Sequence, residues 1–300
     1  MHMERSDRSQ ASDGRGSRKP PLAPGLHIVS TPIGNMRDIT LRALDVLQAA
    51  DLIACEDTRV FAKLASHYGI SAPTIAYSDA TQEAAEPRIL RALGDSKRVA
   101  LVSDAGTPLV SDPGYRLVRE ALSRGHLVTA APGPSAVPMA LALSGLPMDR
   151  FFFGGFLPSR PAERRRAIAE AAAIPATLIF FEAPHRLAAS LADLSDLLGD
   201  RAAAVARELT KLFEEVRRAS LGELAAHYAR EAEVKGEIAI VIGPPSGAPA
   251  PAADVLDAAL RLAMAGASVK DAAAEVAARF GLKRREVYAR ALALKREGAS

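Results

Sequence analysis

The stretch LHIVSTPIGNMRD at residues 26–38 shows in one place the pattern on which this 300-residue chain is built. An apolar run at 26–31 predicts a buried strand, a turn with Pro32 and Gly34 follows, and helical spacing occupies 41–50. The cycle repeats four times, with strands at 52–55, 74–77, 99–102 and 127–130 and helices at 59–68, 81–93, 115–124 and 135–144. Five such cycles predict an α/β domain whose parallel, Rossmann-like sheet is covered by helices on both faces.

The alternation becomes less regular after residue 145. Apolar runs at 151–156, 178–181, 202–206 and 237–242 alternate with helices at 164–173 and 187–198, and 213–220 could be a further strand before a helix at 221–230. This pattern predicts a second α/β domain with a mixed sheet. We therefore divide the chain into a disordered tail at 1–24, an N-terminal α/β domain at 25–145, a second α/β domain at 146–245, and a linker with a helical domain at 246–300.

The segment at 269–294 has the outline of a helix-turn-helix, with a short turn around Gly281. Small and apolar residues occupy its inward spacing: Ala273, Val276, Ala277, Leu282, Val287 and Ala291. Cations on its second helix favour nucleic-acid binding. A helical hairpin that only packs on a neighbour gives the same pattern, so both interpretations stay open at this point.

The net charge of +3 is unevenly distributed along the chain. Residues 1–24 carry +2 and residues 250–300 carry +3, which leaves −2 on the body between them. From Arg279 onward, seven basic residues face two acidic ones. The distribution indicates that a polyanion is bound by an appendage rather than by the main domains, although a solvated helix face would carry the same charge.

The composition excludes several classes of protein. No apolar run approaches the roughly 20 residues of a membrane span, and the N-terminus lacks the apolar core of a signal peptide. The single cysteine, Cys55, excludes internal disulfides and Cys-rich metal sites, and the six histidines lack ligand spacing. We therefore expect a cytoplasmic protein without a bound metal. Only 5% of the residues are aromatic, with no tryptophan, which argues against a stacking platform for single-stranded nucleic acid.

Ligands of a parallel sheet bind beyond the carboxyl ends of its strands. Four of the five loops at these ends are rich in glycine, proline or charge: STPIGN at 30–35, EDTR at 56–59, SDAGTP and SDPG at 103–108 and 111–114, and APGPS at 131–135. They predict a rigid crevice for a small polar cofactor. The absence of G-x-G-x-x-G and of a P-loop argues against dinucleotides and nucleotide hydrolysis. Ser135 lies outside a G-x-S-x-G motif, which favours a helix N-cap over a nucleophile.

Seven segments follow one another in the order and spacing of a known family: LHIVSTPIGNMRD at 26–38, DLIACEDTR at 51–59, VSDAGTPLVSDPG at 102–114, PGPSA at 132–136, FFEAPHRL at 180–187, ARELTK at 206–211 and KGEIAIVIGP at 235–244. From about 25 to 245 they resemble the small-subunit ribosomal RNA methyltransferase I family, a branch of the tetrapyrrole (precorrin/corrin) methylases. The basic helical tail is similar to that family's extra C-terminal domain. The resemblance implies S-adenosylmethionine as donor and the ribose 2'-hydroxyl of a decoding-centre cytidine in 16S rRNA as acceptor. It also implies a homodimer, with the cofactor folded into the cleft between the two α/β domains.

The resemblance and the strand-end positions together suggest the site residues. We expect the cofactor at Pro32, Gly34, Ser103, Asp104, Ala105, Gly106, Thr107, Pro132, Gly133, Pro134, Ser135, Phe181 and Ala206. The catalytic candidates are polar groups at strand ends, namely Asp57, Glu182, Glu208 and Lys211. RNA contacts are expected from Arg59, His185, Arg186, Lys283, Arg284, Arg285 and Arg290.

Several of these residues have a structural alternative. Asp104 either contacts the cofactor or caps the Gly106 turn, and Asp57 and Glu56 either exchange protons or pair with Arg59. Two clusters of charged residues follow strands of the second domain: Glu182, His185 and Arg186, and Arg207, Glu208 and Lys211. These clusters either contact a phosphate or the ribose hydroxyl, or form structural salt bridges. No sequence pattern names the general base.

One element departs from the family, whose members generally carry His-Asn-Glu after the third strand. This chain has Ser78-Asp79-Ala80-Thr81-Gln82 there, so any role of that element is weakened or taken by Asp79 or Glu83. Two other functions stay open from the residues alone. One is a small-molecule, tetrapyrrole-type C-methyltransferase, which would not need the cations at 279–296. The other is a non-catalytic nucleic-acid-binding protein that senses S-adenosylmethionine.

Overall fold

The computed structural model describes residues 22–231, 233–245, 253–280, 282 and 284–297. The chain forms two compact units. The first runs to Pro134 without the short segment Ile33–Asn35, and the second contains Ile33–Asn35 and everything from Ser135. Most of the predicted tail at 1–24, and residues 246–252 of the predicted linker, lie outside the described residues.

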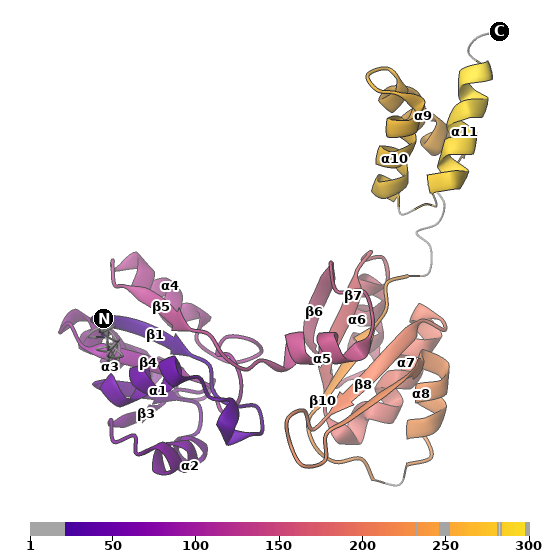
Figure 1. Cartoon of the computed structure of the whole chain (residues 1–300). Helices are drawn as coiled ribbons and strands as arrows, with labels where there is room; N and C mark the ends of the chain where they lie inside the picture. Colours follow the sequence, from indigo (N-terminus) through magenta and orange to yellow (C-terminus); the bar gives the residue numbers. More distant parts are fainter. Residues whose placement is uncertain (1–21, 232, 246–252, 281, 283, 298–300) are drawn as a thin grey trace, which may run out of the picture. The chain divides into compact units, whose positions relative to one another are not determined.

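The first unit contains a five-stranded sheet in the order β3-β2-β4-β1-β5, and every pairing in it is parallel (Figure 1). Its strands are β1 (Gly25–Val29), β2 (Leu52–Cys55), β3 (Thr74–Ala76), β4 (Arg98–Val102) and β5 (Val128–Ala131). The connections carry a 3-10 turn, η1 (Met36–Asp38), and the helices α1 (Leu41–Ala49), α2 (Thr58–Tyr68), α3 (Gln82–Gly94) and α4 (Tyr115–Ser123). The predicted parallel, doubly covered sheet is confirmed.

Both faces of this sheet are buried because successive side chains of a strand point to opposite sides. In β4, Ala100 and Val102 pack with residues of α1 and α2, whereas Val99 and Leu101 pack with residues of α3 and α4. Each face therefore has its own hydrophobic core, which leaves the strand-end loops as the polar edge of the unit.

The second unit contains a mixed sheet in the order β6-β7-β10-β8-β9 (Figure 1). Its strands are β6 (Phe151–Phe156), β7 (Thr177–Glu182), β8 (Ala202–Arg207), β9 (Glu215–Ser220) and β10 (Ile238–Ile242), and only β6 and β7 pair in parallel. The helices are α5 (Ala136–Ser144), α6 (Pro161–Ala172), α7 (Leu187–Leu198) and α8 (Leu221–Tyr228), with a 3-10 turn η2 (Pro184–Arg186). The mixed sheet was predicted, and so was the strand before α8.

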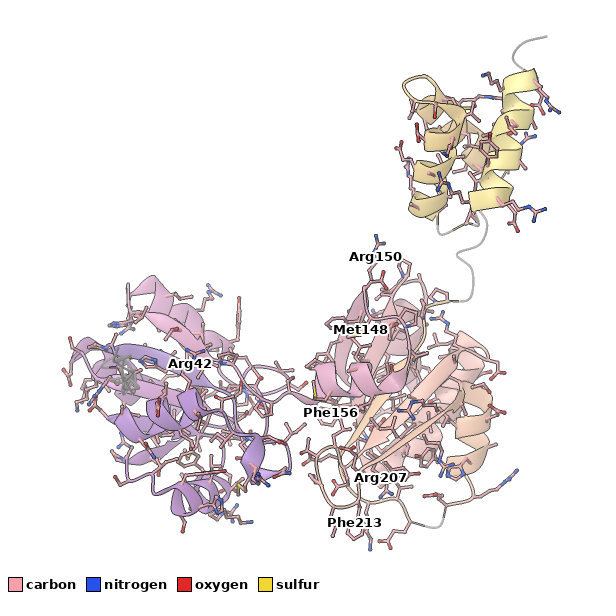
Figure 2. All side chains as sticks on the ribbon, viewed as in Figure 1. Arg42, Met148, Arg150, Phe156, Arg207 and Phe213 are labelled. Atoms are coloured by element: carbon pink, nitrogen blue, oxygen red, sulfur yellow. The ribbon has the colours of Figure 1, made fainter. Side chains whose placement is uncertain are left out.

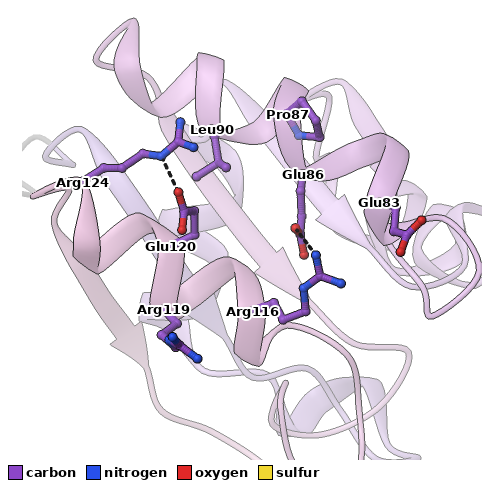
Figure 3. A pocket seen from close by; sticks show the side chains of 8 residues that line it. All are labelled: Glu83, Glu86, Pro87, Leu90, Arg116, Arg119, Glu120 and Arg124. Atoms are coloured by element: carbon purple, nitrogen blue, oxygen red, sulfur yellow. Dashed lines mark hydrogen bonds and ion pairs between the residues drawn. The ribbon is translucent and has the colours of Figure 1, made fainter.

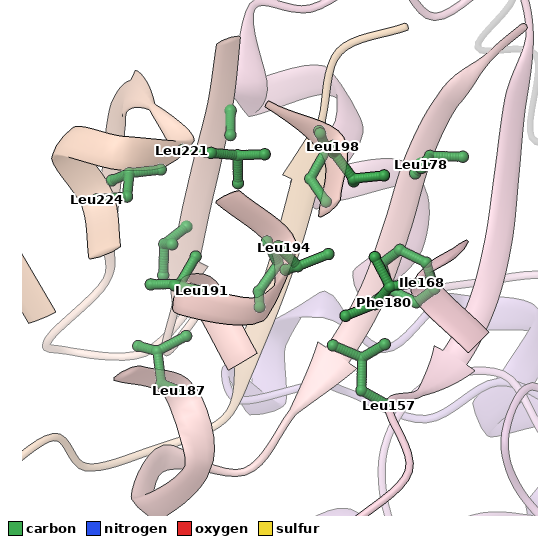
Figure 4. Packing of buried hydrophobic residues seen from close by; sticks show 14 of the residues in the cluster. Leu157, Ile168, Leu178, Phe180, Leu187, Leu191, Leu194, Leu198, Leu221 and Leu224 are labelled. Carbon is green, nitrogen blue, oxygen red and sulfur yellow. The ribbon is translucent and has the colours of Figure 1, made fainter. Parts of the chain in front are cut away.

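Helices α6, α7 and α8 cover one face of this sheet. Figure 4 shows leucines of α7 and α8 packed with Ile168 of α6 and Phe180 of β7. The opposite face carries α5, because Arg218, which pairs with Ala204 on that face of β8 and β9, donates to the carbonyl of Leu143 at the end of α5.

Helix α5 belongs to the second unit, although the predicted domain boundary at residue 145 assigns it to the first. The helix is apolar and buries Val137, Ala140 and Leu141. It packs along β10 and β8, two strands that come much later in the sequence. The alternation of strands and helices could not distinguish this partner from the preceding sheet, because both are apolar surfaces of the same kind.

Three helices form the C-terminal domain: α9 (Ala253–Met264), α10 (Val269–Phe280) and α11 (Arg284–Glu297). Leu260 of α9 packs with five of the residues predicted on the inward spacing of the last two helices, and Leu282 is partly buried against the same core. The two predicted helices are therefore present, with α9 as a third packing helix, and Gly281 of the predicted turn lies outside the described residues. None of the described helices is long and apolar enough to span a membrane.

Candidate active site

The loops after β1 and β4 are joined by a short backbone bridge. The N–H of Thr31 donates to the carbonyl of Gly106 at 2.8 Å, and the N–H of Gly106 donates back at 3.1 Å. The Thr31 hydroxyl donates to the carbonyl of Ser103 at 3.2 Å. Gly106 has φ +81°, a conformation that favours glycine. The bridge holds the predicted cofactor residues 103–107 against the end of β1.

The loop after β5 is tied to the same edge. Thr107 donates its hydroxyl to the carbonyl of Pro134 at 3.1 Å and lies 3.0 Å from the hydroxyl of Ser30. A Cβ on Gly133 would lie 3.0 Å from the Cβ of Ser30, which is tighter than ordinary contact. The predicted cofactor residues of three loops thus form one edge with close backbone packing, and Pro132, Gly133 and Asp104 are exposed on it.

The loop between β4 and α4 holds an unusual backbone. Leu109 and Ser111 have φ +72° and +68°, in the left-handed region that side chains other than glycine rarely adopt. Such strain concentrates at functional sites, where the surrounding structure over-determines it. The observation supports the prediction that residues 103–114 form a binding loop.

Three carboxyl groups near the ends of β2 and β4 have raised pKa values. Burial and then the charge of Glu56 raise the pKa of Asp112 to about 6. Burial raises the pKa of Glu56, with a further contribution from Asp104, and partial desolvation of the carboxyl group raises that of Asp104, although the residue as a whole is exposed. Carboxylates that repel one another in this way favour a cation beside them. Asp112 was not among the predicted site residues. Its segment SDPG was counted with the loops at the strand ends, and this position was a signal that could have identified Asp112.

Asp57 has a structural role that the sequence left undecided. Its side chain accepts from the N–H of Arg59 at 2.8 Å and caps α2, and the Arg59 guanidinium lies 2.5 Å from it. These hydrogen bonds lower the pKa of Asp57 to about 2. A carboxyl group so acidic is a poor proton acceptor at neutral pH, so pairing with Arg59 prevails over catalysis. The N–H of Asp57 donates to Asp104 at 3.0 Å, so Asp104 supports this turn instead of capping Gly106.

Glu182 is enclosed in the second unit, and its side chain is 0% exposed. One oxygen accepts from the N–H of Ala183 at 2.7 Å and lies 2.5 Å from Arg186, and the other accepts from Ser190. This burial excludes direct contact with a substrate in the described conformation. Glu182 therefore positions Arg186, while the neighbouring His185 is exposed.

Glu208 and Lys211 lie together in the loop between β8 and β9. The Lys211 ammonium is 2.8 Å from Glu208 and 3.3 Å from Glu237. The hydrogen bond from Lys211 lowers the pKa of Glu208. Partial burial acts to lower the pKa of Lys211, but the contacts with Glu208 and Glu237 outweigh it and raise that pKa. Both groups therefore stay charged near neutral pH, which suits orientation of a ligand better than proton transfer.

The segment Ile33–Asn35, which follows the first predicted cofactor residue, packs on this loop of the second unit. The N–H of Asn35 donates to the hydroxyl of Thr210 at 3.1 Å. A Cβ on Gly34 would lie 2.4 Å from Cγ of Lys211, so glycine is required for this close approach. The structure thus brings Gly34 and Lys211 together, two residues predicted separately.

The remaining predicted cofactor residues occupy the second sheet and its entry. Phe181 and Ala206 both pair with Ala239 of β10 and so form one row across the sheet. The ring of Phe181 contacts those of Phe153 and Phe156, with centroids 4.9 and 5.4 Å apart. Ser135 takes the N-cap position of α5 that was predicted, but its side chain makes no capping hydrogen bond.

The predicted RNA residues of the C-terminal domain divide into two groups. Arg284 and Arg285 are exposed at the start of α11. Arg290 instead bridges α11 to α9, donating from Nε to Asp257 at 2.7 Å, and also lies 3.2 Å from Glu297. Arg290 therefore has a structural role within the domain, and Lys283 lies outside the described residues.

The element that departs from the family serves the start of α3. The Thr81 hydroxyl accepts from the N–H of Ser78 at 2.9 Å and lies 3.1 Å from its hydroxyl. Asp79 and Glu83 are exposed beside this turn. The local hydrogen bonds explain how the turn forms without the family's residues.

A groove of about 620 Å³ lies between α3 and α4, away from these loops (Figure 3). Its charges largely compensate one another, with Arg124 at 2.8 Å from Glu120 and Arg116 at 3.6 Å from Glu86. Across the described part of the chain, no group of three or more His, Cys, Asp or Glu residues could hold a metal ion.

Two family models match the chain. Tetrapyrrole (Corrin/Porphyrin) Methylases matches residues 25–225, and the RsmI C-terminal HTH domain matches residues 249–295. Among solved structures, a cobalt precorrin-4 methyltransferase (17% identity, TM-score 0.56) covers 73% of this chain and 94% of its own. A diphthine synthase (19% identity, TM-score 0.57) covers 73% and 89%. At these identities the two structures show the fold alone.

Curated relatives are much closer in sequence. A ribosomal RNA small subunit methyltransferase I from Mesorhizobium japonicum is 50% identical over 276 residues, which is 92% of this chain and 94% of that protein. The protein of the same name from Pseudomonas aeruginosa is 42% identical over 280 residues, 92% and 98% of the two chains. The chain therefore belongs to the ribosomal RNA small subunit methyltransferase I family of tetrapyrrole methylases.

Proposed function

We propose that this chain methylates the ribose 2'-hydroxyl of a decoding-centre cytidine in the 16S rRNA of the small ribosomal subunit. The family makes it an S-adenosylmethionine-dependent methyltransferase, and the proposal adds the acceptor. The observation that carries it is the 50% identity to a protein named for small-subunit rRNA over 92% of this chain, basic helical domain included. Because ribosomes are assembled in the cytoplasm of bacteria, such an enzyme would work there.

The residues present fit the cofactor. Gly106, Thr107 and Gly133 keep backbone groups close together at the strand ends, as a small polar ligand requires. Glu56, Asp104 and Asp112 are carboxyl groups of the strand-end loops, and their pKa values are raised first by burial and then by neighbouring carboxylates. When bound, S-adenosylmethionine supplies a methyl group on a cationic sulfur, and these carboxylates would hold that cation.

Orientation of the acceptor would be the main task of the protein, because methyl transfer is an in-line displacement in which positive charge is lost. The charged pair of Glu208 and Lys211 is suited to hold the ribose or a neighbouring phosphate, since both groups keep their charge at neutral pH. Of the carboxyl groups considered, Asp112 has a pKa close to the working pH, and it is our candidate for the proton acceptor.

The exposed cations of α11 would bind the rRNA backbone. Arg284 and Arg285 lie next to each other on the surface of a domain matched by the RsmI C-terminal HTH model. Contacts of this kind neutralise phosphates and release counterions, so they position the RNA without reading its sequence. His185 and Arg59, exposed on the two units, would add further contacts.

The proposal includes a homodimer. Apolar side chains are exposed on the edge strand β6 and the turn before it, with 55% of Met148, 50% of Phe151 and 56% of Phe156 accessible (Figure 2). An edge strand with clustered apolar side chains is a surface that another chain covers in stable proteins. Light scattering that gives the mass of one chain at micromolar concentration would contradict this part.

The acceptor is tested by incubating the purified chain with small ribosomal subunits and S-adenosylmethionine labelled in the methyl group. We expect label in 16S rRNA, at a cytidine whose ribose becomes resistant to alkaline cleavage, and mass spectrometry would locate it. Label in a small tetrapyrrole but none in rRNA would sink the proposal. Binding of S-adenosylmethionine without any methylated product would indicate a sensor.

A further inference from the structure

The loop that joins β8 and β9, residues 208–214, presents two large apolar side chains to solvent. Leu212 is 90% exposed and Phe213 is 70% exposed, and Figure 2 labels Phe213 on this loop of the second unit. A single exposed apolar residue is ordinary on a protein surface. Two in succession at the end of a loop, one of them aromatic, need an explanation.

The loop has a defined conformation. Glu208 and Thr210 have φ +52° and +64°, and the N–H of Thr210 donates to a Glu214 carboxylate oxygen at 2.7 Å. The N–H of Lys211 donates to the carbonyl of Glu208 at 3.0 Å. Gly236 makes room for Glu208, because a Cβ there would lie 2.4 Å from Cγ of Glu208. A side chain held on such a loop loses little conformational entropy when it binds, as a recognition element requires.

Charged side chains lie on the same hairpin as the exposed ring. Glu215 bridges Arg207, at 2.8 Å, and Arg217, at 2.9 Å. Lys211 precedes the apolar pair, so guanidinium and ammonium groups lie along the same hairpin. The β6 edge, at the opposite end of the sheet, clusters apolar side chains instead. Residues 207–218 of the hairpin carry four basic side chains and three acidic ones, and an aromatic ring exposed on such a hairpin fits a nucleic acid, whereas the β6 edge fits another protein.

The hairpin also contacts the segment that carries a cofactor motif. Thr210 and Lys211 hold Asn35 and Gly34 through the hydrogen bond and the close approach described above. Phe213 lies two residues after Lys211 on the same loop. A base on its ring would thus belong to a nucleotide near Gly34 and Asn35.

We propose that Phe213 stacks on an unstacked base of the acceptor RNA, with the cations of the β8–β9 hairpin beside the adjoining backbone. The inference rests on the proposed function and specifies how the acceptor is held. Sequence-specific recognition of RNA commonly uses bases that stack on aromatic side chains. A single ring is enough for one base, which agrees with a chain that has few aromatic residues and no tryptophan.

The test compares four variants in methyl transfer to small ribosomal subunits. Phe213→Ala should lower kcat/KM roughly 10- to 100-fold, the order of magnitude of one base stacked on a ring. Phe213→Leu, which keeps apolar bulk without the ring, should lose nearly as much, and Phe213→Tyr should restore most of the activity. Leu122→Ala, at a 57% exposed site on α4, is the matched control and should behave as wild type.

Two further measurements separate the explanations. The affinity for S-adenosylmethionine, measured by calorimetry, should be the same in all variants, and so should the oligomeric mass. Full activity of Phe213→Ala with an active wild type overturns the inference and leaves the proposed function standing. A smaller oligomer in Phe213→Ala also overturns it, because the ring would then contact a second copy. A wild type inactive on subunits overturns the proposed function and this inference with it.

Discussion

The hydroxyl of Thr107 lies 3.0 Å from the hydroxyl of Ser30 and donates to the carbonyl of Pro134. This contact joins the loops that follow β1, β4 and β5. Ser30 and Thr107 are 77 residues apart in the sequence. The rigidity of the proposed cofactor loops depends on it.

Replacing Thr107 with valine keeps the shape of the side chain and removes the hydroxyl. We expect the dissociation constant for S-adenosylmethionine to rise about tenfold, because a hydrogen bond of this kind contributes about 1 kcal/mol and its removal leaves buried groups unpaired. Thr107→Ser, which keeps the hydroxyl, is the control. Calorimetric affinities that are equal for the valine and serine variants would show that the hydrogen bond does not support binding.

Cofactor binding should weaken as the pH falls below about 6. Burial raises the pKa of Asp112 to about 6, so this carboxyl group becomes neutral in mildly acidic solution and attracts a cation less. Asp112→Asn should bind more weakly at neutral pH and show a flatter dependence on pH. The dissociation constant, measured between about pH 5 and 8, tests this, and parallel profiles for the two proteins would contradict it.

The same Asp112→Asn variant should fold at least as stably as wild type at neutral pH. A carboxyl group whose pKa is higher in the folded than in the unfolded state stabilises the fold while protonated. That stabilisation is lost as the pH rises through the window from about 4 to 6. Thermal unfolding at pH 7 compares the stability of the variant with that of wild type. An unfolding temperature well below that of wild type would indicate an additional structural contact of Asp112.

Removal of Glu182 should lower the free energy of unfolding, with no direct effect on the catalytic step. Its carboxylate is fully buried with Arg186 and Ser190, and removal of one partner of such a group typically costs about 3–5 kcal/mol. Urea unfolding of Glu182→Ala should therefore show a large decrease in the free energy of unfolding, and Glu182→Gln a smaller one. A stably folded alanine variant with a strongly reduced kcat would instead establish a catalytic role.

Arginines of α11 should separate into RNA-binding and structural residues. The double variant Arg284→Ala with Arg285→Ala should bind small ribosomal subunits more weakly. Its affinity should depend less steeply on salt, by about one unit of slope for each phosphate that is no longer neutralised, with unchanged thermal stability. Arg290→Ala removes the bridge to Asp257 and should lower the unfolding temperature of the C-terminal domain. Equal salt slopes for the double variant and wild type would contradict the assignment.

The alternation of apolar strands and helices was enough to predict both sheets, because burial on one or both faces leaves a periodic pattern in the chain. The seven motifs at the strand-end loops and in the second sheet were enough to identify the family, and the cofactor site that they suggest stays a prediction. Those properties are local, and each depends on residues only a few positions apart. The length and amphipathic spacing of α10 and α11 were predicted for the same reason.

Tertiary structure alone decided which groups meet across long sequence separations. It placed α5 with the second sheet, paired Arg290 with Asp257, and brought Gly34 against Lys211. It also raised the pKa of Asp112, whereas the pKa of Asp57, an acid with the same side chain, is lowered by Arg59 only two residues along the chain. Burial and the charge of Glu56 set the pKa of Asp112, and both arise only when distant segments pack together, so sequence spacing contains no record of them.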